Sequence, residues 1–151
     1  MLEDAKWPIL DDIPQEYSAF GRGDLRNPAL EVINSDGTNI ADLQYKSYKI
    51  IKGKPSITGL PSTYGEAGDN LETLAVELED KISKITVILY YSVFEDYDII
   101  TRYTDVINNS NTDVTLRNVM SACIDFDHKN FDVISNYGTH CRERMIERFP
   151  L

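Results

Sequence analysis

The chain has 151 residues, 42% hydrophobic and 26% charged, a size and composition that suit one domain with a hydrophobic core. Its formal net charge of -10 disfavours binding to nucleic acid and to anionic membranes. No apolar run approaches the roughly 20 residues of a membrane-spanning helix, and the first residues do not resemble a signal peptide. Cys123 and Cys141 are too few for a disulfide framework, so we expect free thiols and a cytoplasmic location.

The first third of the chain is predicted to be irregular and then to form a hairpin. Prolines and turn residues interrupt any period over residues 1–28. Residues 29–52 are predicted to form the hairpin, because the sequence Asn-Ser-Asp-Gly at 34–37 is a strong turn signal between two apolar runs. A change of parity between Tyr45 and Tyr48 predicts a bulge in its second strand.

A long hairpin is predicted at the centre of the chain. Glycines and prolines predict a loop over residues 53–70. Residues 71–79 fit a helical stripe and a strand equally well, and we choose a strand because their neighbours are β-rich. Residues 84–94 are almost continuously β-branched or aromatic, which is typical of a strand buried on both faces. A short acidic joint connects them to a second β-rich arm over 97–109.

The last third also predicts strands. A strand is expected over residues 114–126, and alternate side chains should face the core: Val114, Leu116, Met120, Ala122, Ile124 and Phe126. Residues 131–134 predict a short strand, and residues 136–138 a turn. The fold class is therefore all-β, an antiparallel β-sandwich in one domain over 1–151, irregular over 1–28 and with its strands over 29–151. We expect this sandwich to be incomplete at both ends.

Few residues offer chemistry of their own. His128, His140, Cys123 and Cys141 lack the spacing of metal ligands, and no phosphate-binding loop or nucleophile elbow is present, so no metal and no cofactor is predicted. Asp125 and Asp127 share a face in a strand, about 7 Å apart by the strand rise, which fits the two carboxylates of a glycosidase. A solvated turn is the alternative interpretation of these acids. Nine tyrosines make a carbohydrate-binding surface conceivable.

An ordered set of short motifs resembles one family over nearly the whole chain. They include Gln-Glu-Tyr at 15–17, Gly-Asp-Leu-Arg-Asn-Pro-Ala at 23–29, Gly-Leu-Pro-Ser-Thr-Tyr at 59–64, Val-Phe-Glu-Asp-Tyr-Asp at 93–98, Ser-Ala-Cys-Ile-Asp-Phe at 121–126 and Arg-Glu-Arg at 142–144. Together they are similar to the N-terminal β-supersandwich domain of bacterial α-galactosidases, glycoside hydrolase family 36.

The resemblance implies a fold, partners and a reaction. In that family the β-supersandwich precedes a (β/α)₈ barrel, and the whole enzyme is a retaining glycosidase that removes terminal α-galactose from melibiose and raffinose. Its catalytic aspartates lie in the barrel, so no catalytic residue is expected in this chain. The implied partners are the barrel domain, neighbouring subunits of a homo-oligomer, and the galactoside substrate. Further strands are expected before Met1 and after Leu151.

The resemblance also assigns two candidate substrate contacts. In tetrameric members, an arginine and a tryptophan of this domain contact sugar at the active-site mouth of a neighbouring subunit. The arginine aligns near Lys6, which keeps the charge without the bidentate fork. The tryptophan position is His140, within the sequence Gly-Thr-His-Cys-Arg-Glu-Arg at 138–144.

Three hypotheses follow. The favoured one is a non-catalytic β-sandwich that supports oligomer assembly and frames the active site of a neighbouring subunit. The alternative is a stand-alone carbohydrate-binding module. The third is a small hydrolase that uses Asp125 and Asp127.

Overall fold

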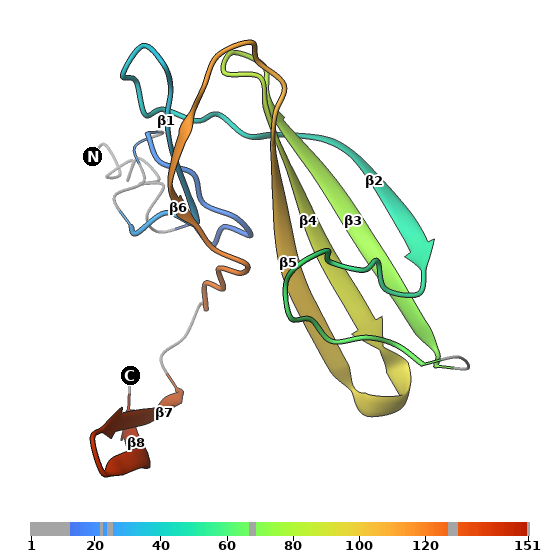
Figure 1. Ribbon diagram of the computed structural model, residues 1–151, viewed down its shortest axis with the longest axis vertical. Coiled ribbons are helices and arrows are strands. Elements are labelled where there is room, and N and C mark those ends of the chain that lie inside the picture. The colour runs from blue at the N-terminus through green and yellow to red at the C-terminus, as the bar shows by residue number, and fades with distance from the viewer. Residues whose placement is uncertain (1–12, 22, 24–25, 67–68, 127–129, 151) are drawn as a thin grey trace, which may run out of the picture.

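The computed structural model describes residues 13–21, 23, 26–66, 69–126 and 130–150. In this part of the chain the elements are β1 (Leu30–Ile33), β2 (Gln44–Lys52), β3 (Leu71–Asp80), β4 (Ile85–Phe94), the short 3₁₀ turn η2 (Glu95–Tyr97), β5 (Ile99–Asn108), β6 (Thr115–Val119), β7 (Asp132–Thr139) and β8 (Arg142–Pro150). They form three antiparallel sheets with the orders β1-β6, β2-β3-β4-β5 and β7-β8 (Figure 1). The all-β, sandwich-like class is confirmed.

The four-stranded sheet is built around β4. Its β-branched and aromatic side chains are buried or half-buried on both faces along most of its length, as the sequence predicted. The ambiguous segment is β3, which pairs with β4 from Leu71 opposite Phe94 to Asp80 opposite Ile85. The predicted central hairpin is confirmed as β4 and β5, and η2 joins them, with Asp98 at a left-handed φ of 52°.

The edge strand β2 has the predicted bulge. Its register with β3 shifts between Tyr45 and Ser47, so that Tyr45 and Tyr48 both lie on the same face of the sheet. The predicted pairing of the two strands of the 29–52 hairpin is wrong. β1 pairs with β6, from Leu30 opposite Val119 to Ile33 opposite Thr115.

The reason for this pairing is the path of the chain after the turn. The turn at 34–37 forms, since the Gly37 N–H donates to the Asn34 carbonyl at 2.9 Å and Gly37 adopts a φ of 84°. Beyond it the chain does not return along β1. Instead the Ala41 N–H donates to the Phe20 carbonyl at 3.0 Å, and the chain passes on to the larger sheet as β2.

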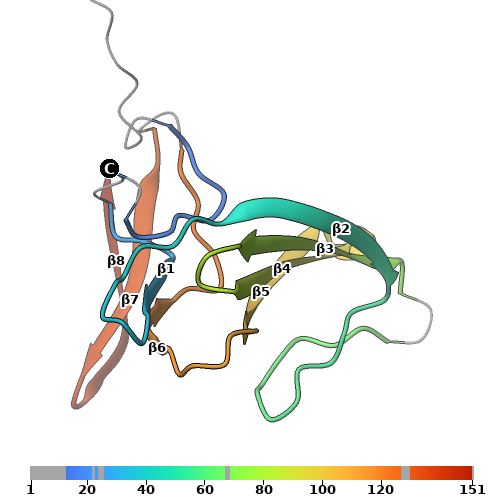
Figure 2. The same ribbon diagram turned by 90° about the horizontal axis from the view of Figure 1, so that it is seen from above.

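The hydrophobic core lies between the β1-β6 pair and one face of the four-stranded sheet (Figure 2). From the smaller layer it takes Leu30 and Val32, and from the larger it takes Ile85, Val87 and Leu89. All five are buried. Removing each of these side chains from water stabilises the fold by about 1.5–3 kcal/mol.

The predicted strand over 114–126 is too long. β6 ends at Val119 because its partner β1 begins at Leu30, which lies opposite Val119. Val114 and Met120 pack against the core as predicted, but the prediction for Leu116 is wrong, since its side chain is exposed. Cys123, of the opposite parity, packs against the core. Ile124 and Phe126 are exposed instead.

The predicted turn at 136–138 is also wrong. β7 runs straight through it to Thr139, and the chain turns at His140 and Cys141 instead. A positive φ at Cys141 and a register shift next to Gly138 make that turn possible. We call the resulting β7–β8 hairpin (Asp132–Pro150) the arm.

Candidate functional site

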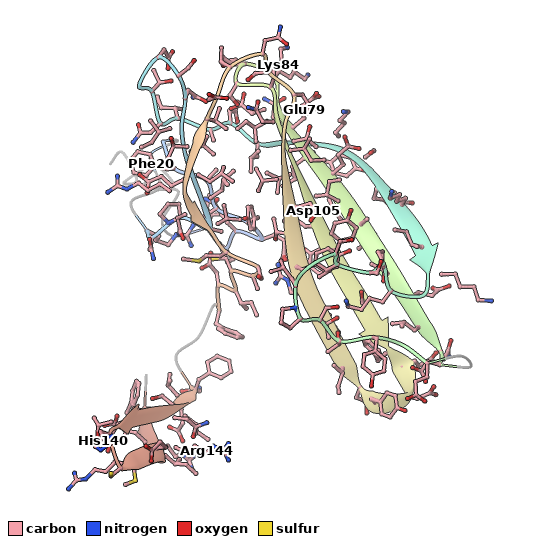
Figure 3. All side chains as sticks on the ribbon, in the orientation of Figure 1. Phe20, Glu79, Lys84, Asp105, His140 and Arg144 are labelled. Atoms are coloured by element: carbon pink, nitrogen blue, oxygen red, sulfur yellow. The ribbon has the colours of Figure 1, made fainter. Side chains whose placement is uncertain are left out.

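The arm presents His140 at its tip. Its strands pair from Asp132 opposite Pro150 to Thr139 opposite Arg142, which leaves His140 and Cys141 as a two-residue turn. His140 is exposed, and Figure 3 shows it at the end of the arm, well away from Phe20 and from the four-stranded sheet. Lys6, the other predicted substrate contact, lies outside the described residues.

Both faces of the arm carry apolar side chains. On one face Val133 lies opposite Phe149, and Tyr137 lies opposite Met145. On the other face Ile134 and Ile146 are both largely exposed. Every residue of β8 is exposed. A two-stranded hairpin is at best marginally stable in water, so this surface suits burial against another molecule or domain.

The metal candidates that the structure describes do not form a site. Cys123 is half-buried against the core, whereas Cys141 lies in the turn of the arm, and both are free thiols. His128 is outside the described residues. Among the residues that the structure describes, no group of three or more His, Cys, Asp or Glu side chains could hold a metal ion. The same residues include no helix that is long and apolar enough to cross a membrane.

Asp125, one of the two candidate carboxylates, has a structural partner. It forms an ion pair with Arg26, and the same Oδ2 accepts the backbone N–H of Gln15 at 2.8 Å. The Arg26 guanidinium also donates to the Ile13 carbonyl at 3.1 Å. Asp127 lies outside the described residues. Asp125 thus ties the N-terminal segment to the chain beyond β6.

A second polar cluster ties the same segment to the sheet. The Glu16 carboxylate accepts hydrogen bonds from Arg102 at 2.5 Å and from the Tyr91 hydroxyl at 2.7 Å. The Arg102 guanidinium lies 4.7 Å from the centre of the Tyr91 ring. Burial, and then the hydrogen bond to Glu16, raise the pKa of the Tyr91 phenol. Glu16, Tyr91 and Arg102 therefore bind one another, and these contacts hold residues 15–17 across the sheet.

Beyond the core, the face of the four-stranded sheet that packs against the β1-β6 pair is exposed to solvent. This open face consists of five large apolar side chains on four neighbouring strands: Tyr48, Ile50, Leu74, Val93 and Ile100. Tyr48, Ile50 and Ile100 are each more than 60% exposed. A groove of about 560 Å³ begins where Glu16 and Tyr17 cross the sheet, and its floor includes Leu74 and Leu89. The open face therefore continues the core, and no layer covers it among the residues that the structure describes.

The opposite face of the sheet contacts the start of the loop that follows β2. The Thr73 hydroxyl lies 2.7 Å from the Gly53 carbonyl and 2.8 Å from the Ser92 hydroxyl, and both Thr73 and Ser92 are fully buried. Tyr90 and Tyr103 stack with their ring centroids 4.2 Å apart. Burial, and then the neighbouring charges, raise the pKa of Tyr103 to about 12. The bond from Thr73 to Gly53, and Lys54 over the Tyr103 ring at 5.4 Å, hold the start of the loop on the sheet.

Sequence reasoning did not identify the partners in the two polar clusters. Glu16, Arg26 and Asp125 lie in motifs that carry the family resemblance, which was the available signal. Their residue types alone do not show which charges meet, because 86 residues separate Glu16 from Arg102 and 99 separate Arg26 from Asp125. These motifs therefore contain residues that connect segments far apart in the sequence.

Comparison with known proteins agrees with this geometry. The family model described as the glycosyl hydrolase family 36 N-terminal domain matches residues 1–151. The bifunctional alpha-galactosidase/sucrose kinase AgaSK of Mediterraneibacter gnavus is 41% identical over 142 residues, which are 94% of this chain and 15% of that protein. Alpha-galactosidase Mel36A of Lactobacillus acidophilus is 42% identical over 138 residues, 91% of this chain and 19% of that protein.

Solved structures show the same fold. A variant of the alpha-galactosidase AgaA from Geobacillus stearothermophilus, in complex with raffinose, superposes with a TM-score of 0.90 at 39% identity. The match covers 94% of this chain and 20% of that one. The chain thus spans about a fifth or less of the length of these relatives. It belongs to glycosyl hydrolase family 36, whose N-terminal domain it matches from its first residue to its last.

Proposed function

We propose that this chain is the non-catalytic N-terminal part of an α-galactosidase that hydrolyses terminal α-galactosides of the melibiose and raffinose type. Its role is to support assembly of the oligomer and to frame the active site of a neighbouring subunit. The observation that carries this proposal is the arm, exposed along all of β8 and most of β7 and tipped by His140. Its relatives are alpha-galactosidases, and the structure of one of them holds raffinose.

The chemistry of the described residues supports a role without catalysis. A retaining glycosidase needs two free carboxylates about 5–5.5 Å apart. Asp125 is paired with Arg26, and Glu16 is paired with Arg102. The apolar side chains of the arm and of the open face are suited to contacts with protein.

Hydrolysis of a chromogenic α-galactoside by the purified chain tests the absence of catalysis. The chain is expected to release no more chromophore than a buffer blank. Turnover above the blank that disappears in Asp125→Asn would instead establish the small hydrolase. The inactive double variant Asp125→Asn/Arg26→Gln serves as the matched protein control for traces of contaminating enzyme.

A carbohydrate-binding module remains the second candidate, favoured by one observation. Tyr45 and Tyr48 lie on the same face of β2, and each exposes 63% of its surface. Exposed aromatic rings on one face can stack on sugars. Titration calorimetry with galactose and with raffinose distinguishes the two: heat that is lost in Tyr48→Ala supports the module, and no heat at millimolar sugar rejects it.

A further inference from the structure

The arm is a separate two-stranded sheet in the part of the chain that the structure describes. Within the described residues, β7 and β8 pair only with each other. Figure 1 shows the arm standing apart from both layers of the sandwich. No neighbouring strand therefore fixes its direction. Contacts that can set the direction of the arm lie at its root, between β6 and Asp132.

Two sets of contacts meet at that root. Asp125 forms the ion pair with Arg26 and accepts the Gln15 N–H at 2.8 Å. The Arg26 and Asp125 side chains are only 27% and 22% exposed, so solvent and salt screen this pair less than a pair on the open surface. Arg26 is held in turn by the Ile13 carbonyl at 3.1 Å. Asp125 is thus anchored to two separate points of the N-terminal segment.

The second contact follows directly along the chain. The rings of Phe126 and Phe131 lie with their centroids 4.4 Å apart and are tilted by 47°. Phe126 adjoins Asp125, and Phe131 immediately precedes β7. This geometry is typical of a favourable aromatic pair. It places Phe131, the residue just before the arm, against Phe126, the residue just after Asp125.

We propose that Asp125 and the Phe126–Phe131 pair form a latch that sets the pose of the arm relative to the sandwich. The N-terminal segment, Asp125, Phe126, Phe131 and β7 form one continuous series of contacts. Asp125 is a positioning residue: it touches no substrate and acts through the direction of the arm. The importance of that direction rests on the proposed function, but the pose itself is a property of this chain alone.

The pose can be measured inside one molecule. Cys141 in the turn of the arm is a natural site for a spin label, once Cys123→Ala removes the other thiol. Lys81→Cys supplies the second label, on the exposed turn between β3 and β4. Pulsed electron paramagnetic resonance on the dilute chain then gives the distribution of distances between the two labels. Dilution keeps the chains apart, so failure of the assembly proposal does not affect this measurement.

The latched arm is expected to give one narrow distribution. Release of the root should broaden the distribution by several ångströms, because the arm can then take more than one direction. Asp125→Asn, Arg26→Gln and Phe131→Ala should each broaden it. The double variant Asp125→Asn/Arg26→Gln should broaden it by less than the sum of the two single changes, because the two side chains share one ion pair.

A matched control separates the latch from general loosening. Glu31 and Arg117 also form an ion pair across 86 residues, but between β1 and β6. Glu31→Gln should leave the distribution narrow. Equal broadening in Glu31→Gln, or an unchanged distribution in both Asp125→Asn and Phe131→Ala, overturns the latch. Arg26→Gln keeps the test decisive if a variant of Asp125 fails to fold.

Discussion

The carboxylate of Glu16 lies 2.5 Å from the guanidinium of Arg102, although 86 residues separate them in the sequence. Arg102 also stacks on the Tyr91 ring, whose hydroxyl donates to the same carboxylate. This cluster fixes residues 15–17 on the sheet next to Tyr17, a member of the core. The cluster connects the irregular N-terminal segment to the four-stranded sheet.

Glu16→Gln should lower the free energy of unfolding by about 0.5–1 kcal/mol, since Glu16 is 63% exposed and its pair is partly screened. Arg102→Met should lower it by about 1–2 kcal/mol, because its side chain is only 16% exposed and the stacking on Tyr91 is lost as well. Urea unfolding of both single variants and the double variant measures the coupling. Strictly additive losses would show that the two side chains do not interact.

Thr73→Val should lower the free energy of unfolding by more than its small change of shape suggests. It leaves the Gly53 carbonyl and the buried Ser92 hydroxyl without their partner, at a cost of about 1–3 kcal/mol. Adding Ser92→Ala should recover part of that loss, because an unpaired buried hydroxyl is then removed. Thermal unfolding measures both, with the exposed Thr115→Val as a control expected within about 0.5 kcal/mol of the native chain. A Thr73→Val loss as small as that of the control would contradict the buried network.

Asp80 should make the stability of the chain sensitive to acid. Burial raises the pKa of its carboxyl, but the backbone N–H groups of Asp42, Ile82 and Ser83 outweigh burial and hold the pKa below its ordinary value. The unfolded state therefore binds the proton more readily than the folded state. The contribution of Asp80 is complete above the ordinary pKa of about 3.9 and is lost as the pH falls through the lower native value.

Thermal unfolding of native chain and Asp80→Asn across pH 7 to 2 tests this sign. The variant should be less stable at pH 7 by about 1–3 kcal/mol, since its amide keeps only one acceptor oxygen. The gap should close towards the acid end. Asp113→Asn, at an exposed position of the β5–β6 connection, is the control and should follow the native curve. A gap that stays constant down to pH 2 would rule out the ionised carboxylate as its cause.

His140 can be tested in a complete enzyme. In a chimaera, this chain replaces the matching segment of the Geobacillus stearothermophilus alpha-galactosidase AgaA, to which it is 39% identical. His140→Ala should raise KM for raffinose by roughly tenfold, equivalent to about 1.4 kcal/mol, if the ring contacts sugar. His140→Trp should restore or lower KM, because an indole offers a larger stacking face. Ser135→Ala, further down the arm, is the control; identical KM values in all four proteins would exclude a sugar contact.

The strands were predictable because their signal is local. The β-branched and aromatic run at 85–94 and the turn chemistry at 34–37 act within a few residues, and both behave as predicted. The pairing of β1 was not predictable in the same way. Leu30 finds its partner in Val119, 89 positions further on, and the local turn gives no information about that choice.

The site was predicted less well than the fold, for a related physical reason. Spacing in the sequence suggested Asp125 as a catalytic carboxylate, but its chemistry depends on Arg26, which only the folded chain brings to it. The exposure of His140 depends likewise on where β7 ends. The short turn at 140–141, instead of the predicted one at 136–138, lengthens the arm and places His140 at its tip.

Sedimentation velocity of two chimaeras tests the central claim, that the arm supports assembly of the enzyme. In the first, the intact chain replaces the matching segment of the Geobacillus stearothermophilus alpha-galactosidase AgaA. In the second, residues 135–147 are replaced by the two residues Asn-Gly. This turn connects Ile134 to Arg148, which already lie opposite each other. The account predicts an oligomer for the first and a smaller species for the second. Identical sedimentation of the two proteins would contradict it.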